Sequence, residues 1–400
     1  MVDSNVTAQV PLIPGLPDDL AIICLARVPS LSSLRGVCES WQSLLFHSRI
    51  FHSLRAALGF KPQLWLYVLL YEEGLKVSPS EISRCAFSWH AYDPIADRWH
   101  CLPPFPKSLD FQLTSPSFIG RLHSVQCASS QDKLFMVAGS RRKVCSPSRG
   151  GSPQVAQSLD PDSTDRQPLE PALECPLIFD TRTCTWTNGT PFRVPRKWCV
   201  CGTASGKLIV ASGCGKDWDF SVSKLAEMYD PDKKTWITLE HLKSSKFSGE
   251  AISAVNCNGK LHMVSGKGVF WKVGVVYDPQ TGRWTDMPRG MCNGWNGPCV
   301  AVDGNLFVLE DCTGKLKMYC QSEDNWNTVI REDMLKNMEQ LTQAGPGKFC
   351  GIVRAPCSST SHCQDVVQIV DIRDPATINV LRPPFGQIVT VQVLSRTWLS

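Results

Sequence analysis

Nineteen cysteines are the residues of this chain best suited to chemistry, because thiolates bind metals, attack electrophiles and form disulfides. They are scattered from Cys24 to Cys363, no CxxC occurs, and the closest two are Cys199 and Cys201. A structural zinc site needs closely spaced ligand pairs, and a disulfide scaffold needs an oxidising compartment. The pattern therefore predicts reduced thiols that pack as small hydrophobic residues.

Histidines and tyrosines could together form a copper centre that oxidises alcohols, provided that they converge in space. The histidines beyond residue 62 are dispersed along the chain: His90, His100, His123, His241, His262 and His362. Motifs for other chemistry are missing, because no HExxH and no Ser-centred elbow occur, and Gly213-Cys-Gly-Lys lacks the spacing and the Ser or Thr of a phosphate loop. The sequence predicts no catalytic residue, no metal site and no cofactor.

Length and composition limit the class of protein. The chain has 400 residues, 43% of them hydrophobic and 20% charged, with a net charge of +4, so it has the material for a sizeable core. Near-balanced charge argues against nucleic acid or an anionic membrane as the main partner. The longest apolar stretch, Leu64 to Tyr71, is far shorter than the roughly 20 residues of a membrane span, and the first ten residues do not resemble a signal peptide. We expect a soluble protein of the cytoplasm, the nucleus or both.

Five segments of the chain share one register, in which an aromatic residue is followed seven positions later by a tryptophan. The pairs are Tyr92 and Trp99, Phe179 and Trp186, Tyr229 and Trp236, Tyr277 and Trp284, and Tyr319 and Trp326. A short apolar strand precedes each pair, such as GKLIVASG at 206–213 and GKLHMVSG at 259–266. Residues 347–381 form a sixth copy that has lost both aromatic residues.

Each repeat predicts a four-stranded antiparallel unit in which Asp-Pro forms a tight turn. One such sheet cannot bury both of its faces alone, so the units are expected to stack around an axis as a β-propeller of six blades. The recurrent aromatic residues are expected to pack between the sheets. Residues 387–394 could close the ring by completing the first or the last blade, and the Ser/Pro-rich stretch 140–176 is expected to be a disordered insert.

This repeat resembles the kelch repeat over about 330 residues. The sequence departs from that pattern at the paired glycines that end the second strand. Gly213 and Gly215 are split by a cysteine, Gly139 is single, and Glu310-Asp311 replaces the pair altogether. The resemblance implies an all-β kelch propeller over residues 62–400.

The first 59 residues have a different texture: a polar tail at 1–11 and then a helical periodicity. Pro17 and Asp18-Asp19 suit the first turn of a helix, and Pro29 ends it. Ser30 is expected to cap a second helix, and a third runs through Ile50 and Leu54 towards Gly59. So much apolar surface on three short helices predicts that part of it packs against another chain, while a helical cap on the propeller is the alternative.

The pattern Leu-Pro-x-x-Leu, followed by Val-Cys-x-x-Trp-x-x-Leu, resembles an F-box. Together with the propeller it makes the chain similar to the plant F-box/kelch-repeat proteins, whose F-box docks on the Skp-type linker of a cullin–RING (SCF-type) ubiquitin ligase. The resemblance implies that nine residues of 12–59 contact the linker or form the F-box core: Leu16, Pro17, Leu20, Val28, Leu31, Leu34, Val37, Trp41 and Leu44. Glu39 stands where the family usually has a basic residue.

A target protein would bind the propeller face that carries the loops after the second strands and between the blades. Tryptophans and basic residues in these loops are typical of protein-binding hot spots. The candidates are Arg196, Trp198, Trp218, Lys267, Trp271, Arg289 and Trp295. Alternatively, these tryptophans fold inward as packing.

Taken together, these features predict a substrate adaptor without chemistry of its own. It would bind the linker and, through it, the cullin and RING subunits, and it would hold a target protein for ubiquitination. Two alternatives stay open: a kelch-propeller enzyme similar to the copper enzyme galactose oxidase, and an F-box scaffold that does not promote degradation.

Overall fold

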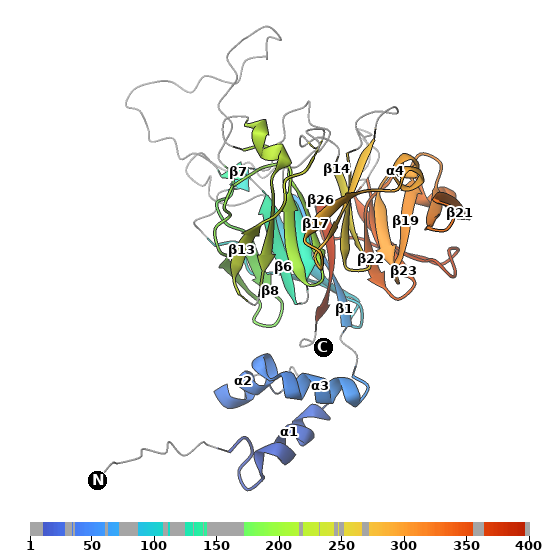
Figure 1. Ribbon diagram of the computed structural model, residues 1–400. Coiled ribbons are helices and arrows are strands. Elements are labelled where there is room, and N and C mark those ends of the chain that lie inside the picture. Colours follow the sequence, from blue (N-terminus) through green and yellow to red (C-terminus); the bar gives the residue numbers. More distant parts are fainter. Residues whose placement is uncertain are drawn as a thin grey trace, which may run out of the picture.

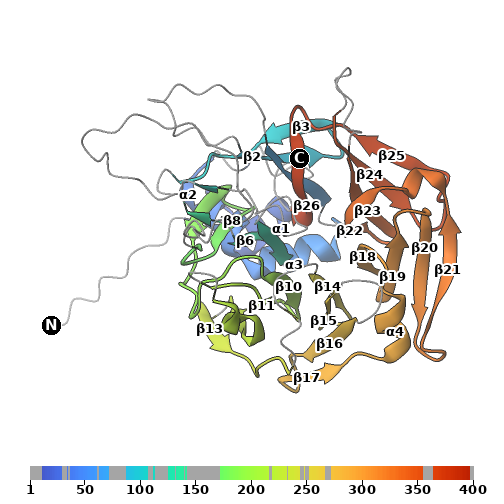
Figure 2. The same ribbon diagram turned by 90° about the horizontal axis from the view of Figure 1, so that it is seen from above.

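The computed structural model describes residues 11–28, 34, 37–60, 63–71, 87–106, 111–112, 125–130, 132–138, 140–141, 172–215, 219–231, 233–243, 247, 252–265, 272–354 and 364–396. Six four-stranded antiparallel sheets stand radially around a central axis, which confirms the six-bladed propeller (Figure 2). Three helices precede it and lie on one side of the ring (Figure 1).

The blades are numbered here in chain order, with their strands given from the axis outward. Blade 1 comprises β26 (Gln387–Arg396), β1 (Gln63–Tyr71), β2 (Phe87–Asp93) and β3 (Arg98–Cys101). Blade 2 comprises β5 (Gln126–Ser130), β6 (Lys133–Ala138), β8 (Leu177–Asp180) and β9 (Thr185–Asn188). Blade 3 comprises β10 (Val200–Ala204), β11 (Lys207–Ala211), β12 (Ala226–Asp230) and β13 (Thr235–Thr238).

The other three blades have the same arrangement of four strands. Blade 4 comprises β14 (Ile252–Cys257), β15 (Lys260–Ser265), β16 (Val273–Asp278) and β17 (Arg283–Asp286). Blade 5 comprises β18 (Cys299–Val302), β19 (Asn305–Glu310), β20 (Lys315–Cys320) and β21 (Asn325–Arg331). Blade 6 comprises β22 (Met338–Gly345), β23 (Lys348–Val353), β24 (Val366–Asp371) and β25 (Ile378–Leu381). The connecting loops add η2 (Phe220–Lys224), α4 (Arg289–Gly294) and η3 (Asp333–Leu335).

The ring is closed by its two ends. The C-terminal strand β26 pairs with β1 along the whole of β1, so the first blade contains the last strand of the chain. The sequence had left the choice between the first and the last blade open. With β26 in place, the six innermost strands contact one another in an unbroken cycle.

The repeated aromatic residues face each other across the two outer strands. In blades 1 to 5 the aromatic residue of the third strand pairs directly with the tryptophan of the fourth, and the ring centroids lie 4.9–5.3 Å apart. Blade 6 has Val370 opposite Ile378 at the same register, as its degenerate sequence predicts.

Each of four repeat tryptophans also bonds to the blade before its own. The indole N–H donates to a backbone carbonyl just after the outer strand of the preceding blade, at 2.9–3.0 Å. Trp284 of blade 4, for example, donates to the carbonyl of Glu240 beyond β13. The repeat tryptophan therefore joins neighbouring blades as well as filling the space between them.

The turns that join first to second strands lie on one side of the ring, here called the turn face. Ser205-Gly206, Asn258-Gly259 and Asp303-Gly304 all have positive φ at both positions, the geometry of tight hairpin turns. Ser205 and Asn258 donate to the carbonyl of the next turn's glycine, and Asp303 accepts from the amide of Gly347. This chain of bonds ties four consecutive blades together. The opposite side, which carries the long loops, is called the loop face.

Three helices form the N-terminal segment: α1 (Asp18–Ala26), α2 (Glu39–His47) and α3 (Arg49–Ala57). They lie on the turn-face side, where β1 begins and β26 ends (Figure 1). The second helix begins later than Ser30, because Cys38 has an extended backbone (φ −162°, ψ 167°) that no helix interior accepts. Leu34 and Val37 consequently lie in turns before α2, and the prediction that they are helical is wrong.

The disordered insert predicted at 140–176 is too long at both ends. Ser140–Arg141 form β7, which pairs with β4 (Phe111–Gln112). At the other end, Leu173 is buried and the carbonyl of Glu174 accepts a hydrogen bond from Phe192. Residues 142–171 of that prediction, and residues 1–10 of the predicted tail, lie outside the described residues.

Replacing Trp284 by Ala removes a buried indole and its bond to blade 3, so we expect the free energy of unfolding to fall by about 3–5 kcal/mol. Urea denaturation measures the change. The control is Ile237→Ala on β13, because Ile237 is 40% exposed and should cost well under half as much. Equal losses for the two variants would contradict the role given to the repeat tryptophan.

Candidate protein-binding surfaces

The helical segment has a small core of its own. Leu25, Ala26, Leu45 and Phe51 are buried in it together with two residues predicted for this role, Leu34 and Leu44. Three further predicted residues, Leu16, Val28 and Trp41, are half-buried. Val28 and Trp41 pack against the buried group.

Two polar contacts hold the three helices together. The Trp41 indole donates to the carbonyl of Leu12, at 2.6 Å. Arg55 of α3 is buried, and its guanidinium donates to the carbonyls of Ala26 and Val28 at the end of α1, at 3.0 and 2.6 Å. A cation at a helix C-terminus satisfies carbonyls that lack a partner within the helix. Sequence analysis missed Arg55, although its place between Phe51 and Leu58 on one face of α3 was the available signal.

Several apolar side chains of the segment stay outside this core. Leu20 is 46% exposed, Val37 55%, Ile50 74% and Leu58 40%, and Pro17 is also exposed. Three of these, Pro17, Leu20 on α1 and Val37 just before α2, are among the residues predicted to contact a linker. Apolar surface of this kind on so small a unit is typical of a protein interface. The ninth predicted residue, Leu31, lies outside the described residues.

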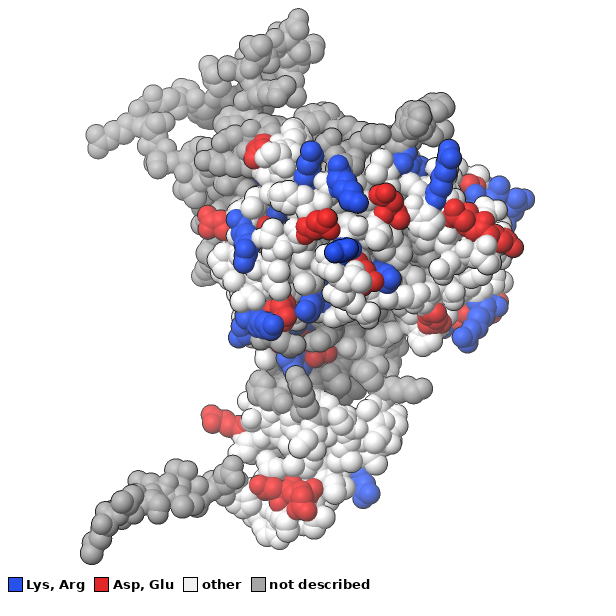
Figure 3. All heavy atoms as spheres, viewed as in Figure 1, with Lys and Arg blue, Asp and Glu red and all other residues white. Residues whose placement is uncertain are grey.

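Charge is mixed over the propeller face that Figure 3 shows, with lysine and arginine beside aspartate and glutamate. The helical segment below it carries few charged side chains on the same view. The described surface in this view therefore has no concentrated basic field of the kind that nucleic acid requires.

On the loop face, Arg196 does not face a partner as predicted, because it is buried in an ion pair with Glu227. Its guanidinium also donates to the carbonyls of Leu225 and Val194, at 2.9 and 3.1 Å. The Glu227 carboxylate accepts two further bonds from the amides of Arg193 and Val194. This network fixes the segment between blades 2 and 3.

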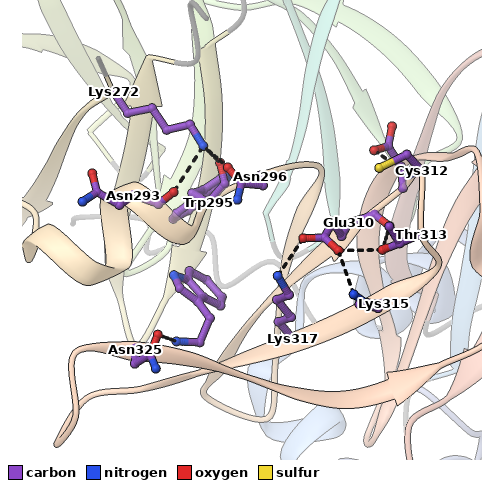
Figure 4. Close-up of polar contacts among 12 residues, drawn as sticks. Lys272, Asn293, Trp295, Asn296, Glu310, Cys312, Thr313, Lys315, Lys317 and Asn325 are labelled. Atoms are coloured by element: carbon purple, nitrogen blue, oxygen red, sulfur yellow. Dashed lines mark hydrogen bonds and ion pairs between the residues drawn. The ribbon is translucent and has the colours of Figure 1, made fainter. Parts of the chain in front are cut away.

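Trp198 and Trp295 are buried as well, so for them the inward-packing alternative holds and the prediction of exposure is wrong. Trp295 packs edge-on against Trp326 of blade 5, with ring centroids 6.2 Å apart. Lys272 holds the turn around Trp295 by donating to the carbonyls of Asn293 and Trp295 and to the side chain of Asn296 (Figure 4). Burial lowers the pKa of Lys272.

Arg289 is the one substrate-face candidate that the described residues show to be exposed. It opens α4 on the rim of blade 4. Trp218, Lys267 and Trp271 lie outside the described residues. Other exposed side chains on the same face include Phe220 of η2 and Met334 of η3, which sequence analysis missed because neither belongs to a repeat position.

Three of the described histidines, His52, His90 and His100, pack against aromatic rings. His90 is buried against Phe385 with a ring centroid distance of 5.2 Å, and burial lowers its pKa. His100 stacks on Trp65, while His262 lies in blade 4. Among the residues that the structure describes, no three His, Cys, Asp or Glu side chains are grouped so as to hold a metal ion. In the same residues, no helix has the length and apolarity to cross a membrane.

Comparison with known proteins adds to this geometry. The family described as "FKB95, Kelch-repeats domain" matches residues 170–348. The F-box/kelch-repeat protein SKIP25 of Arabidopsis thaliana is 31% identical over 96% of this chain and 90% of its own length. This chain belongs to the F-box/kelch-repeat family. A second Arabidopsis thaliana F-box/kelch-repeat protein is 30% identical over 86% of this chain and 78% of its own length. The F-box protein AFR of the same plant is 28% identical over 76% of this chain and 70% of its own length.

Departures from the kelch glycine pairs now have a structural explanation. Gly213 has φ +99°, and a Cβ there would lie 2.5 Å from the carbonyl oxygen of Lys197, so glycine is required. In blade 5, Glu310 accepts from Lys317 and Thr313 and pairs with Lys315, across the turn to β20 (Figure 4). The charged residues replace the glycines by forming a short, bonded turn.

Replacing Arg196 by Met leaves the Glu227 carboxylate buried without its cation, so we expect a loss of about 3–5 kcal/mol in the free energy of unfolding. The double variant Arg196→Met with Glu227→Gln should lose less than the single one, because the buried charge is gone. Lys260→Met removes a partly exposed pair with Asp278 and should cost about 1 kcal/mol or less. Urea denaturation compares the three, and an Arg196→Met variant as stable as Lys260→Met would refute the role of the network.

Proposed function

We propose that this F-box/kelch-repeat protein is a substrate adaptor of an SCF-type ubiquitin ligase. In this proposal residues 12–59 are the F-box, which docks on the Skp-type linker and through it on the cullin and RING subunits. The loop face of the propeller holds a target protein. The observation that carries the proposal is the exposed apolar surface of Leu20, Val37, Ile50 and Leu58, on the segment whose sequence resembles an F-box.

The two surfaces lie on opposite sides of the molecule, which supports simultaneous binding. The helical segment lies beyond the turn face, and α4 of the loop face lies on the other side of the ring (Figure 1). A linker on the helices therefore leaves the loop face open. The turn-face hydrogen bonds and the closure by β26 make the ring a rigid spacer between the two partners.

The mechanism is proximity. Holding a target near the charged ubiquitin conjugate turns an encounter between two molecules into a reaction within one complex. This role needs no bond-making residue in the chain, and it places the protein in the cytoplasm or the nucleus, where such ligases act.

Introducing a negative charge into the apolar surface tests linker binding. Leu20→Asp and Val37→Asp place a carboxylate where an apolar contact would form, so we expect the full chain to lose linker binding by at least 100-fold. Both side chains are largely exposed, so the melting temperature should change little. The matched control is Ile95→Asp on the turn between β2 and β3, since Ile95 is 65% exposed and lies on the propeller.

Linker affinity is measured by titration calorimetry with the purified linker, and unchanged binding by both aspartate variants would refute the F-box assignment.

A second experiment separates adaptor from scaffold. Proteins captured by the Val37→Asp chain in cells should accumulate relative to cells with the native chain. If the captured proteins have the same lifetime in cells with the Val37→Asp chain and in cells with the native chain, the result would favour a scaffold that does not promote degradation.

A further inference from the structure

The central channel of the propeller is a cavity of about 590 Å³, and the innermost strands of all six blades line it. Ligand pockets in proteins usually enclose about 300–1,000 Å³, so the cavity has room for a small molecule. In Figure 2, α1 and α3 lie behind the centre of the ring, on the turn-face side.

The lining of the channel, as far as the structure describes it, carries no formal charge. None of its residues is Asp, Glu, Lys, Arg or His, and none is aromatic. Two of its cysteines stay protonated at neutral pH, since burial raises the pKa of Cys127 and raises that of Cys299 to about 12. A charged ligand would lose its hydration here without gaining a counter-charge. The channel therefore selects for neutral molecules.

Polar groups in the lining are arranged by level along the axis. Ser129, Thr203 and Asn256 each occupy the second-to-last position of the innermost strand, in three consecutive blades. Two residues nearer the loop face, the corresponding positions of β5, β10 and β18 are Cys127, Cys201 and Cys299. The layer of hydroxyl and amide side chains therefore lies nearer the turn face than the layer of thiols does.

Several of these polar groups have no bonding role in the fold. The side chains of Gln126, Thr203, Asn256 and Thr342 line the channel and make no hydrogen bond to any residue that the structure describes. Gln340 differs, because it bonds to Thr390 and Val391 and so joins blade 6 to blade 1. The four unbonded groups come from four blades and surround one cavity, so they can bond to one bound molecule.

We propose that the channel binds a neutral, sugar-sized polyol. Hydroxyl groups both donate and accept, which matches the amide and hydroxyl side chains of the lining. The small apolar residues between them, such as Ala254, Ala301 and Val391, suit the C–H surface of such a molecule. The missing aromatic residues argue against a ligand that binds by ring stacking.

Saturation-transfer NMR and calorimetry on the purified full chain test this, with glucose, sucrose and myo-inositol as neutral probes and glucose 6-phosphate as the charged one. We expect saturable binding of at least one neutral probe and at least tenfold weaker binding of the phosphate. Thr203→Val removes one hydroxyl and keeps the shape of the side chain. It should weaken binding of the neutral probe about 3- to 10-fold. Thr328→Val, on the exposed outer strand β21, is the matched control and should leave affinity unchanged.

Asn256→Leu is a second channel variant, which keeps the test valid if Thr203→Val lowers the melting temperature. The proposal is overturned if no neutral probe binds saturably, if the phosphate binds as well as the neutral probe that binds best, or if the channel variants bind like Thr328→Val. Linker binding by the same preparations should be unaffected, so the outcome is separate from that of the adaptor proposal.

Discussion

Every blade of this protein has two apolar faces, and neither can be covered from within the blade. Stability therefore depends on each sheet having a neighbour on both sides, which only a closed ring supplies. The innermost strands form that ring without a break, and β26 provides the last contact by pairing with β1. Because the two ends of the propeller meet in one blade, backbone hydrogen bonds between β1 and β26 hold the ring shut, and side-chain bonds such as that of Gln340 to Thr390 add to them.

The same constraint decides which side chains are left for partners. Aromatic and basic residues are frequent in protein interfaces, yet here several of them serve the joints between blades. The repeat tryptophans bond backward to the preceding blade, Trp295 packs on Trp326, and Arg196 neutralises Glu227 inside a loop. A target on the loop face must therefore be recognised by other side chains, among them Arg289, Phe220 and Met334.

A rigid ring with helices on one side and loops on the other suits a protein that brings two partners together. The apolar surface is concentrated on the helices, where Arg55 and Trp41 hold the segment in shape and leave Leu20 and Val37 outside. The channel between the two surfaces is neutral and polar, unlike the mixed charge of the outer wall. These three environments follow from one architecture, since inner strands, outer strands and appended helices meet different surroundings.

The sequence by itself determined the repeat, the number of blades, the Asp-Pro turns and the family, because each of these rests on spacing within a few residues or on a period along the chain. It also indicated the degenerate sixth blade, where Val370 and Ile378 replace the aromatic pair. Only the tertiary structure decided that Trp198 and Trp295 are buried, that β26 completes the first blade, and that cysteines from three blades share one level of the channel. Each of these depends on which residue of a neighbouring blade lies opposite, a distance of tens to hundreds of residues along the chain that no local pattern records.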